Sequence, residues 1–312
     1  MKFKIFDKEI ELDAPVTVYE ALRAAEASNN KVLAAKVNGE VLELTAPLSG
    51  DAEIVPLTFD DDEGKAVFRH TASHVMAQAV KRLYPDVKLT IGPSVDDGFY
   101  YDFDSEISFT PEILAQIEGE MKKIVKENIK LERFLLPRDE AIKLMEERNE
   151  PYKVLLIARI PEGEDISFYR QGEFVDLCAG PHLFSTGAIK AFKLTQCTGA
   201  YWEGKSENKM LQRVYGVAYP NKADMEAYLA QVEEAKKRDH NKLGRELELF
   251  TTSDLIGQGL PIMLPKGARM IQTLQRFVED EEQKRGWLLT KTPYMAKSDL
   301  YKVSGHWDHY LD

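Results

Sequence analysis

Short strand patterns alternate with helix patterns along this chain, and no apolar run in it reaches the roughly 18 residues of a membrane span. Its 312 residues are long for one domain. The 44% hydrophobic and 30% charged residues are ordinary for a chain that forms a buried core. We therefore expect a multidomain α+β protein with no membrane partner.

Residues 1–61 have the pattern of a β-grasp module. Alternating apolar residues over 3–12 predict a hairpin, and a helix-period stretch follows over 18–27. Asn38-Gly39 suits the tight turn of a second hairpin. An acidic stretch over 59–64 marks the expected boundary.

Residues 62–220 are expected to form a mixed α+β domain. Helices are predicted over 65–84, 111–128 and 137–149, where Thr110-Pro111 is typical of a helix start. Short strands are predicted over 87–91, 99–103, 152–157, 166–169, 174–177 and 192–194.

The C-terminal third begins with a charged stretch over 221–243, which is interpreted as one helix connecting two domains. Residues 244–312 are expected to start a further domain, with a helix over 268–284 and a strand leading to Pro293.

Charge and cysteine content limit the classes of function. A net charge of −11 argues against a protein that coats RNA in general, because phosphate binding needs Lys and Arg. The two cysteines are too few for a disulfide framework, so a reducing cytoplasm is the expected location.

Two pairs of residues with the same four-residue spacing are the candidates for catalysis or ligand binding. His70 and His74 would lie one turn apart on one helix face. Cys178 and His182 share that spacing, but Gly180-Pro181 predicts a loop. Asp176 lies two residues before Cys178, on the same face of the preceding strand.

Three interpretations of these pairs compete. The histidines could be partly buried helix residues with no chemistry. Three His and one Cys could instead bind zinc in a tetrahedral site. Histidines could also orient a water molecule and exchange protons near pH 7 without a metal.

Long stretches around these residues resemble the editing domain of bacterial threonyl-tRNA synthetases. They are FRHTASHVMAQAVKRLYP, IGPSVDDGFYYDFD, EFVDLCAGPHLFSTGAIKAFKL, GAYWEG and NKMLQRVYG. The N-terminal unit resembles the TGS module of that family. The segments KRDHNKLGRELELF and KTPYMAKSDLYKVSGHWDHY are similar to the start of its class II antiparallel-sheet catalytic domain.

The resemblance implies hydrolysis of serine from mischarged seryl-tRNA(Thr). It implies a pocket formed by His70, His74, Lys153, Asp176, Cys178 and His182. His70 with Lys153 would position and activate water, although Lys153 could equally stabilise charge. The other histidines and the thiol would hold the amino group and the ribose. Independently of the resemblance, Tyr100, Asp102 and Tyr201 are candidates for contacting the tRNA end, because aromatic side chains can stack on the terminal adenine.

The resemblance also implies no metal in this pocket, whereas a related alanyl-type site holds zinc on the same four ligands. The full-length family uses ATP, Mg and a catalytic-domain zinc, binds tRNA(Thr) and forms a homodimer. Residues 286–295 resemble its first class II motif, although Thr290 stands where an apolar residue is usual. The sequence ends at Asp312, before the ATP-binding motifs and the ligands of that zinc, so we expect no threonine activation by this chain alone.

A truncated synthetase and a natural editing-only protein both fit this sequence. Two other functions stay open as well. One is a tRNA-binding or regulatory module with an inactive pocket. The other is a zinc-dependent trans-editing hydrolase of the alanyl type.

Overall fold

The computed structural model describes residues 1–13, 15–257 and 259–308. It divides into two compact units, Met1–Leu229 and the residues from Ala230 onward. Several sheets and helices occur in it, which confirms the mixed α+β class. Among the described residues, no helix combines the length and the apolarity that crossing a membrane requires.

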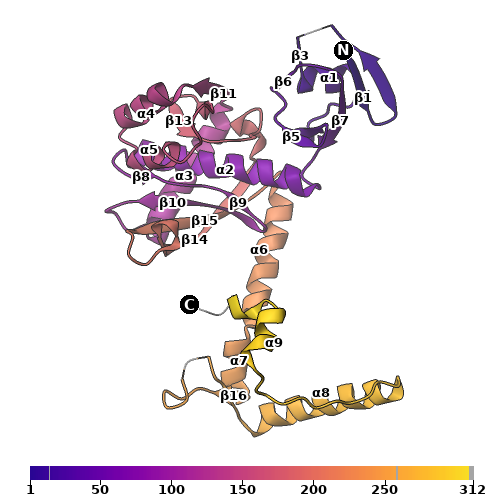
Figure 1. Cartoon of the computed structure of the whole chain (residues 1–312). Helices are drawn as coiled ribbons and strands as arrows, with labels where there is room; N and C mark the ends of the chain where they lie inside the picture. The colour runs from indigo at the N-terminus through magenta and orange to yellow at the C-terminus, as the bar shows by residue number, and fades with distance from the viewer. Residues whose placement is uncertain (14, 258, 309–312) are drawn as a thin grey trace. The chain divides into compact units, whose positions relative to one another are not determined.

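The N-terminal part of the first unit is a five-stranded sheet in the order β2-β1-β7-β4-β5, with helix α1 (Val18–Ala24) as the first helix of the chain (Figure 1). The two predicted hairpins are confirmed, and Asn38 and Gly39 have positive φ angles of 49° and 91° at the second turn. The strands are β1 (Lys2–Ile5), β2 (Lys8–Glu11), β4 (Ala34–Val37), β5 (Glu40–Leu42) and β7 (Ala52–Leu57), while β3 (Val16–Thr17) pairs with β6 (Pro47–Leu48).

Helix α2 (Asp62–Leu83) is the centre of the rest of this unit, and nearly all of its side chains from Val67 to Val80 are buried. It packs against α3 (Pro111–Glu127), which begins at the predicted cap Thr110. It also packs against a sheet in the order β14-β15-β10-β8. The strands are β8 (Lys88–Leu89), β9 (Ser94–Val95), β10 (Gly98–Asp104), β14 (Ala191–Tyr201) and β15 (Met210–Tyr219).

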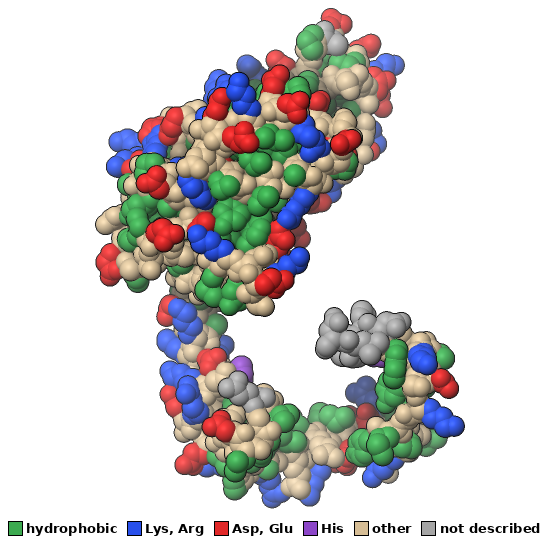
Figure 2. Space-filling view, turned by 60° about the vertical axis from the view of Figure 1, so that its left-hand side comes forward, with side chains coloured by type: hydrophobic (Ala, Val, Ile, Leu, Met, Phe, Trp, Pro, Cys, Tyr) green, Lys and Arg blue, Asp and Glu red, His purple; other side chains and the backbone are tan. Residues whose placement is uncertain are grey.

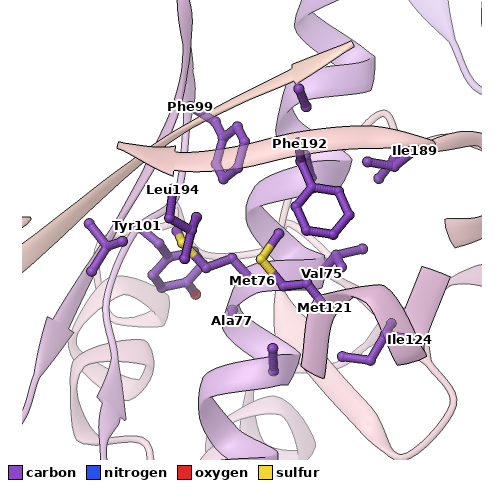
Figure 3. Close-up of a cluster of buried hydrophobic side chains, with 14 of the residues drawn as sticks. Val75, Met76, Ala77, Phe99, Tyr101, Met121, Ile124, Ile189, Phe192 and Leu194 are labelled. Carbon is purple, nitrogen blue, oxygen red and sulfur yellow. The ribbon is translucent and has the colours of Figure 1, made fainter. Parts of the chain in front are cut away.

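The core between this helix and this sheet fixes where α2 lies. Side chains from α2, β10 and β14 meet there, among them Met76, Tyr101 and Leu194 (Figure 3). All three are at most 4% exposed. Because protein interiors are packed as densely as organic crystals, this core fixes the position of α2.

A second, three-stranded sheet presents the loop that carries Cys178. Its antiparallel order is β11-β12-β13. The strands are β11 (Leu131–Leu136), β12 (Ile166–Gln171) and β13 (Phe174–Leu177). Residues of α4 (Arg138–Glu147) and α5 (Pro151–Ile157) form a separate apolar cluster with this sheet. The described chain also has the short 3₁₀ turns η1 (Thr186–Ala188) and η2 (Trp202–Gly204).

The structure corrects the strand predicted over 152–157, which is helix α5. Pro151 stands at its first turn, where the fixed φ of proline suits a helix. The apolar run that follows is too short for periodicity to separate a strand from a helix. The helix buries Lys153 and Ile157, four residues apart.

The second unit also differs from the prediction. The charged helix breaks into α6 (Lys222–Lys237) and α7 (His240–Glu246), because the Asp239 carboxylate accepts a hydrogen bond from the Lys242 amide and starts a new helix. The described residues between Gly286 and Pro293 form no strand. The remaining elements are β16 (Phe250–Thr251), β17 (Ile262–Met263), α8 (Pro265–Lys284), α9 (Ser298–Val303) and η3 (His306–Asp308).

Hydrophobic side chains lie exposed on this second unit (Figure 2). On α8, Leu274 and Phe277 are each 63% exposed, and Trp287 beyond it is 72% exposed. The first unit carries the buried clusters and the site described next.

Candidate active site

Helix α2 contributes the first pair of the site. His70 and His74 are one turn apart, and their ring centroids lie 5.1 Å from each other. His74 is 3% exposed, whereas His70 is only partly buried. His70 is therefore the helix histidine that a ligand could reach first.

The loop after β13 contributes the second pair. Cys178 and His182 flank a tight bend at Gly180, which has a positive φ of 77°. A Cβ atom at Gly180 would lie 2.0 Å from the Tyr169 hydroxyl oxygen. Both the backbone conformation and this close approach require glycine here.

The two pairs meet at the sulfur of Cys178. Its Sγ lies 3.3 Å from His70 Nε2 and 3.3 Å from His182 Nε2, and it accepts a hydrogen bond from the Gly180 amide at 3.2 Å. The ring of His182 lies 4.3 Å from that of His70 and 4.2 Å from that of His74, measured between centroids. One side-chain donor atom from each of the four residues lies within 4.8 Å of the others.

A buried ion pair between Lys153 and Asp176 lies next to this cluster. Asp176 Oδ1 lies 2.6 Å from Lys153 Nζ, and both side chains are about as buried as core residues, at 2% and 3% exposure. The Tyr101 hydroxyl donates to Asp176 Oδ2 at 2.6 Å and accepts from Lys153 Nζ at 3.1 Å. Asp176 Oδ2 lies 3.8 Å from His74 Nε2, so this group reaches the imidazole cluster.

Part of the site lies in a segment that matches a known family. Residues 166–215, which include Asp176, Cys178 and His182, match the family described as the threonyl and alanyl tRNA synthetase second additional domain. A threonine–tRNA ligase of Clostridium perfringens is 58% identical over 303 residues, which are 97% of this chain and 47% of that protein. The threonine–tRNA ligases of Clostridium botulinum and Acetivibrio thermocellus are each 56% identical over 303 residues.

Over nearly its whole length, the chain is similar to these bacterial threonine–tRNA ligases. It spans about half the length of the curated relatives that it matches. The family match covers β12, β13, β14 and the first part of β15, and therefore the thiol loop, whereas the histidine pair of α2 lies outside the matched residues.

Burial sets the protonation states of the histidines and the thiol in this cluster. Burial lowers the pKa of His70 to about 4 and that of His74 to about 3, and it lowers the pKa of His182 well below its usual value. All three rings are therefore neutral near pH 7. Burial raises the pKa of the Cys178 thiol to about 12, so the sulfur keeps its proton.

Asp176 is the ionised member of the site. Burial would raise the pKa of its carboxyl group, but the charge of Lys153, the nearby His74 ring and the bonds from Lys153 and Tyr101 hold that pKa below its usual value. The site thus pairs one buried anion with one buried cation, next to neutral rings.

The structure brings six of the sequence-predicted residues together. They are His70, His74, Lys153, Asp176, Cys178 and His182. Among the described residues, no hydrogen bond, ion pair or ring contact joins Tyr100, Asp102 or Tyr201 to these six. Asp102 is 3% exposed, and its carboxylate is bound by the Arg213 guanidinium at 2.7 and 2.8 Å.

Strand alternation explains this separation. Tyr101 faces the site, so Tyr100 and Asp102 point to the other face of the sheet. There Arg213 lies 4.0 Å from the centroid of the Tyr100 ring. Tyr201 is 41% exposed at the end of β14.

Sequence reasoning missed three residues that contact the site. Tyr101 bonds to Asp176, and the Tyr169 ring lies 4.4 Å from that of His182. Thr71 Oγ1 lies 3.1 Å from His182 Nδ1. Alternation with Tyr100 was the only available signal for Tyr101, and the sequence carries no comparable signal for Thr71 or Tyr169.

Proposed function

We propose that the first unit hydrolyses the ester bond of mischarged seryl-tRNA(Thr), as the editing part of a protein whose overall reaction is threonine–tRNA ligation. One observation carries this proposal: donor atoms of His70, His74, Cys178 and His182 lie within 4.8 Å of one another, beside a buried Lys–Asp pair. The identity of the relatives supports threonine and its tRNA as the substrates. The partner is then tRNA(Thr), the full-length form a homodimer and the location the cytoplasm.

Ester hydrolysis needs a positioned water, an acceptor for its proton and stabilisation of the oxyanion. His70 is the more exposed helix histidine and is neutral near pH 7, so it can accept a proton from water. Its lowered pKa makes it a weak base. The rate would therefore depend strongly on positioning and on charge stabilisation.

Lys153 suits the charge-stabilising role better than that of a base. Its ammonium group lies 2.6 Å from the Asp176 carboxylate and 3.1 Å from the Tyr101 hydroxyl, and these contacts hold it beside the imidazole cluster. An ammonium group has three N–H donors. One contacts Asp176 and one bonds to the Tyr101 hydroxyl. We propose that the third is donated to the oxyanion or to a bound water.

Discrimination against the correct product follows from size. A site that accepts threonine cannot strongly exclude serine, because one methyl group is worth only about 1–3 kcal/mol in binding. A second pocket too small for that methyl group separates the two by excluding threonine. The close packing of three imidazole rings, with centroids 4.2–5.1 Å apart, supports such a small pocket.

A zinc-dependent hydrolase is a second candidate, and the donor set favours it. Three imidazole nitrogens and one sulfur are a complete ligand set for tetrahedral zinc. The 3.3 Å separations between the sulfur and two of the nitrogens are close to the edge of such a tetrahedron. A bound zinc ion would supply a Lewis acid and an activated water. His182 could offer Nε2 to it while its Nδ1 bonds to Thr71.

The test is deacylation of seryl-tRNA(Thr) and threonyl-tRNA(Thr) by the purified 312-residue chain, with and without a chelator. We expect serine to be released, threonine to be largely retained and the chelator to have no effect. Loss of activity with the chelator, restored by zinc, would establish the zinc alternative. Equal hydrolysis of both esters would contradict the selectivity, and hydrolysis of neither would contradict the proposal.

His70→Ala separates an enzyme from an RNA-binding module with an inactive pocket. We expect deacylation to fall while the affinity for tRNA(Thr), measured by filter binding, stays unchanged. His306→Ala is the matched control, because His306 lies in the other unit. Equal deacylation by wild type and His70→Ala would remove His70 from the mechanism.

A further inference from the structure

Thr71 lies between the two helix histidines in sequence and is completely buried. Its hydroxyl group has three partners. It donates to the Val67 carbonyl at 2.9 Å, it accepts from the Leu183 amide at 3.0 Å, and its Oγ1 lies 3.1 Å from His182 Nδ1.

These partners favour one of the two neutral forms of His182, the one with its proton on Nδ1. A hydroxyl group has one proton and two lone pairs, and a carbonyl oxygen can only accept. With the hydroxyl proton of Thr71 directed at the Val67 carbonyl, the contact with His182 uses a proton on Nδ1. The neutral ring then has an unprotonated Nε2.

The form of His182 in turn determines the direction of the hydrogen bonds at Cys178. The unprotonated Nε2 of His182 lies 3.3 Å from Cys178 Sγ, so the single thiol proton points to it. The other contact of the sulfur, to His70 Nε2 at 3.3 Å, must then use a proton on His70. Nδ1 becomes the only nitrogen of His70 that can accept a proton.

We propose that Thr71 is a positioning residue that sets the direction of the hydrogen-bond chain from His70 through Cys178 and His182, and thereby leaves Nδ1 of His70 free as the acceptor. The effect on catalysis rests on the proposed function, because only that function gives His70 a proton to take. The tautomers themselves depend on the fold alone.

Two substitutions isolate the hydroxyl group. Thr71→Val keeps the shape and removes the hydroxyl, and Thr71→Ser keeps the hydroxyl. Thr186→Val is the matched control. Thr186 is also completely buried, and its Oγ1 donates to the Ile124 carbonyl at 2.9 Å and accepts from the Ile129 amide at 2.9 Å. It thus makes the same two kinds of backbone bond as Thr71.

The first measurement needs no substrate. Long-range ¹H–¹⁵N spectra of the chain with ¹⁵N-labelled histidine report which ring nitrogen is protonated, and the His182 signals are assigned by their loss in His182→Asn. We expect His182 to carry its proton on Nδ1 in the wild type, in Thr71→Ser and in Thr186→Val. In Thr71→Val the Nε2-protonated form should grow. Wild-type protein with the proton on Nε2, or no change in Thr71→Val, would overturn the proposal.

The second measurement is seryl-tRNA(Thr) deacylation. At metal-bound histidines, loss of the partner that orients the ring costs about 10- to 100-fold in metal affinity or activity, and we expect a kcat loss of that order for Thr71→Val with KM little changed. Thr71→Ser should restore the rate, and Thr186→Val should leave it unchanged. Equal losses in the two valine variants would mean a purely structural role and refute the inference. If Thr71→Val does not fold, the wild-type tautomer and the rate of Thr71→Ser still decide.

The two proposals can fail separately. Wild-type protein that does not release serine contradicts the proposed function, while the ring spectra still test the hydrogen-bond chain.

Discussion

Replacing Lys153 by Met should be among the most destabilising single changes in the first unit. The substitution leaves Asp176, whose side chain is 2% exposed, without its ion-pair partner at 2.6 Å. Breaking a buried ion pair on one side costs about 3–5 kcal/mol, because the remaining charge stays desolvated. For a unit of this length, Met1–Leu229, that corresponds to a fall in melting temperature of roughly 6–20 °C.

The loss should depend on pH with a definite sign. In the wild type Lys153 helps to hold the pKa of Asp176 below its ordinary value of 3.8. In Lys153→Met the interactions that stabilise the Asp176 carboxylate are weaker, so burial raises the pKa of Asp176 above 3.8. As pH rises, Asp176 then loses its proton in the unfolded chain at a lower pH than in the folded variant, so the variant loses stability. The stability difference should be small below pH 4 and largest above pH 7.

The assay is thermal and urea unfolding of both proteins from pH 4 to pH 8, followed by circular dichroism and calorimetry. Lys4→Met is the matched control, because Lys4 pairs with Glu53 at 3.1 Å while both side chains are more than half exposed. Such a pair contributes about 0–1 kcal/mol. Equal losses in Lys153→Met and Lys4→Met, or a difference that does not change with pH, would refute this reasoning.

Three further outcomes are expected. Burial lowers the pKa of His74 to about 3, so as pH falls below 6.5 the unfolded chain takes up the His74 proton before the folded protein does. The free energy of unfolding should therefore decline by up to about 1.4 kcal/mol per pH unit until pH 3. His74→Gln should flatten this slope in urea titrations, and an unchanged slope would contradict the assignment. Gly180→Ala should lower both stability and deacylation, because its Cβ would meet the Tyr169 hydroxyl oxygen at 2.0 Å, whereas Gly163→Ala, with a positive φ of 88° and open space, should retain deacylation. Cys178→Ser should keep most of the deacylation activity, since a thiol with a pKa of about 12 is no nucleophile near pH 7, and complete loss of activity would argue for a metal or covalent role.

Elements with local signals could be predicted from the sequence. The cap Thr110 and Pro111 at the first turn fix the start of α3 whatever packs against it. The Asn38-Gly39 turn fixes the second hairpin in the same way. The predictions of secondary structure fail where packing against neighbouring elements decides between helix and strand. The short apolar run in α5 fits both equally well until its neighbours are known.

The convergence of the six candidate residues could be predicted from the sequence, but the contacts that connect them could not. A four-residue spacing on a helix already places His70 and His74 on one face. The face of a strand residue depends on the register of the whole sheet, so the alternation of Tyr100 and Tyr101 did not reveal which of them faces the site. The contact of Thr71 with His182 joins residues 111 positions apart, which no local pattern encodes.

The charge balance of the site favours one class of reaction over others. The cation Lys153 is paired with the anion Asp176, and the three imidazoles and the thiol are neutral near pH 7. Such a site gains little by binding a substrate that is already an anion at the reacting atom, as a phosphodiester is. An aminoacyl ester is neutral there and becomes an oxyanion only in the transition state. Fixed donors then act on charge that is absent from the ground state, which is the condition for electrostatic catalysis.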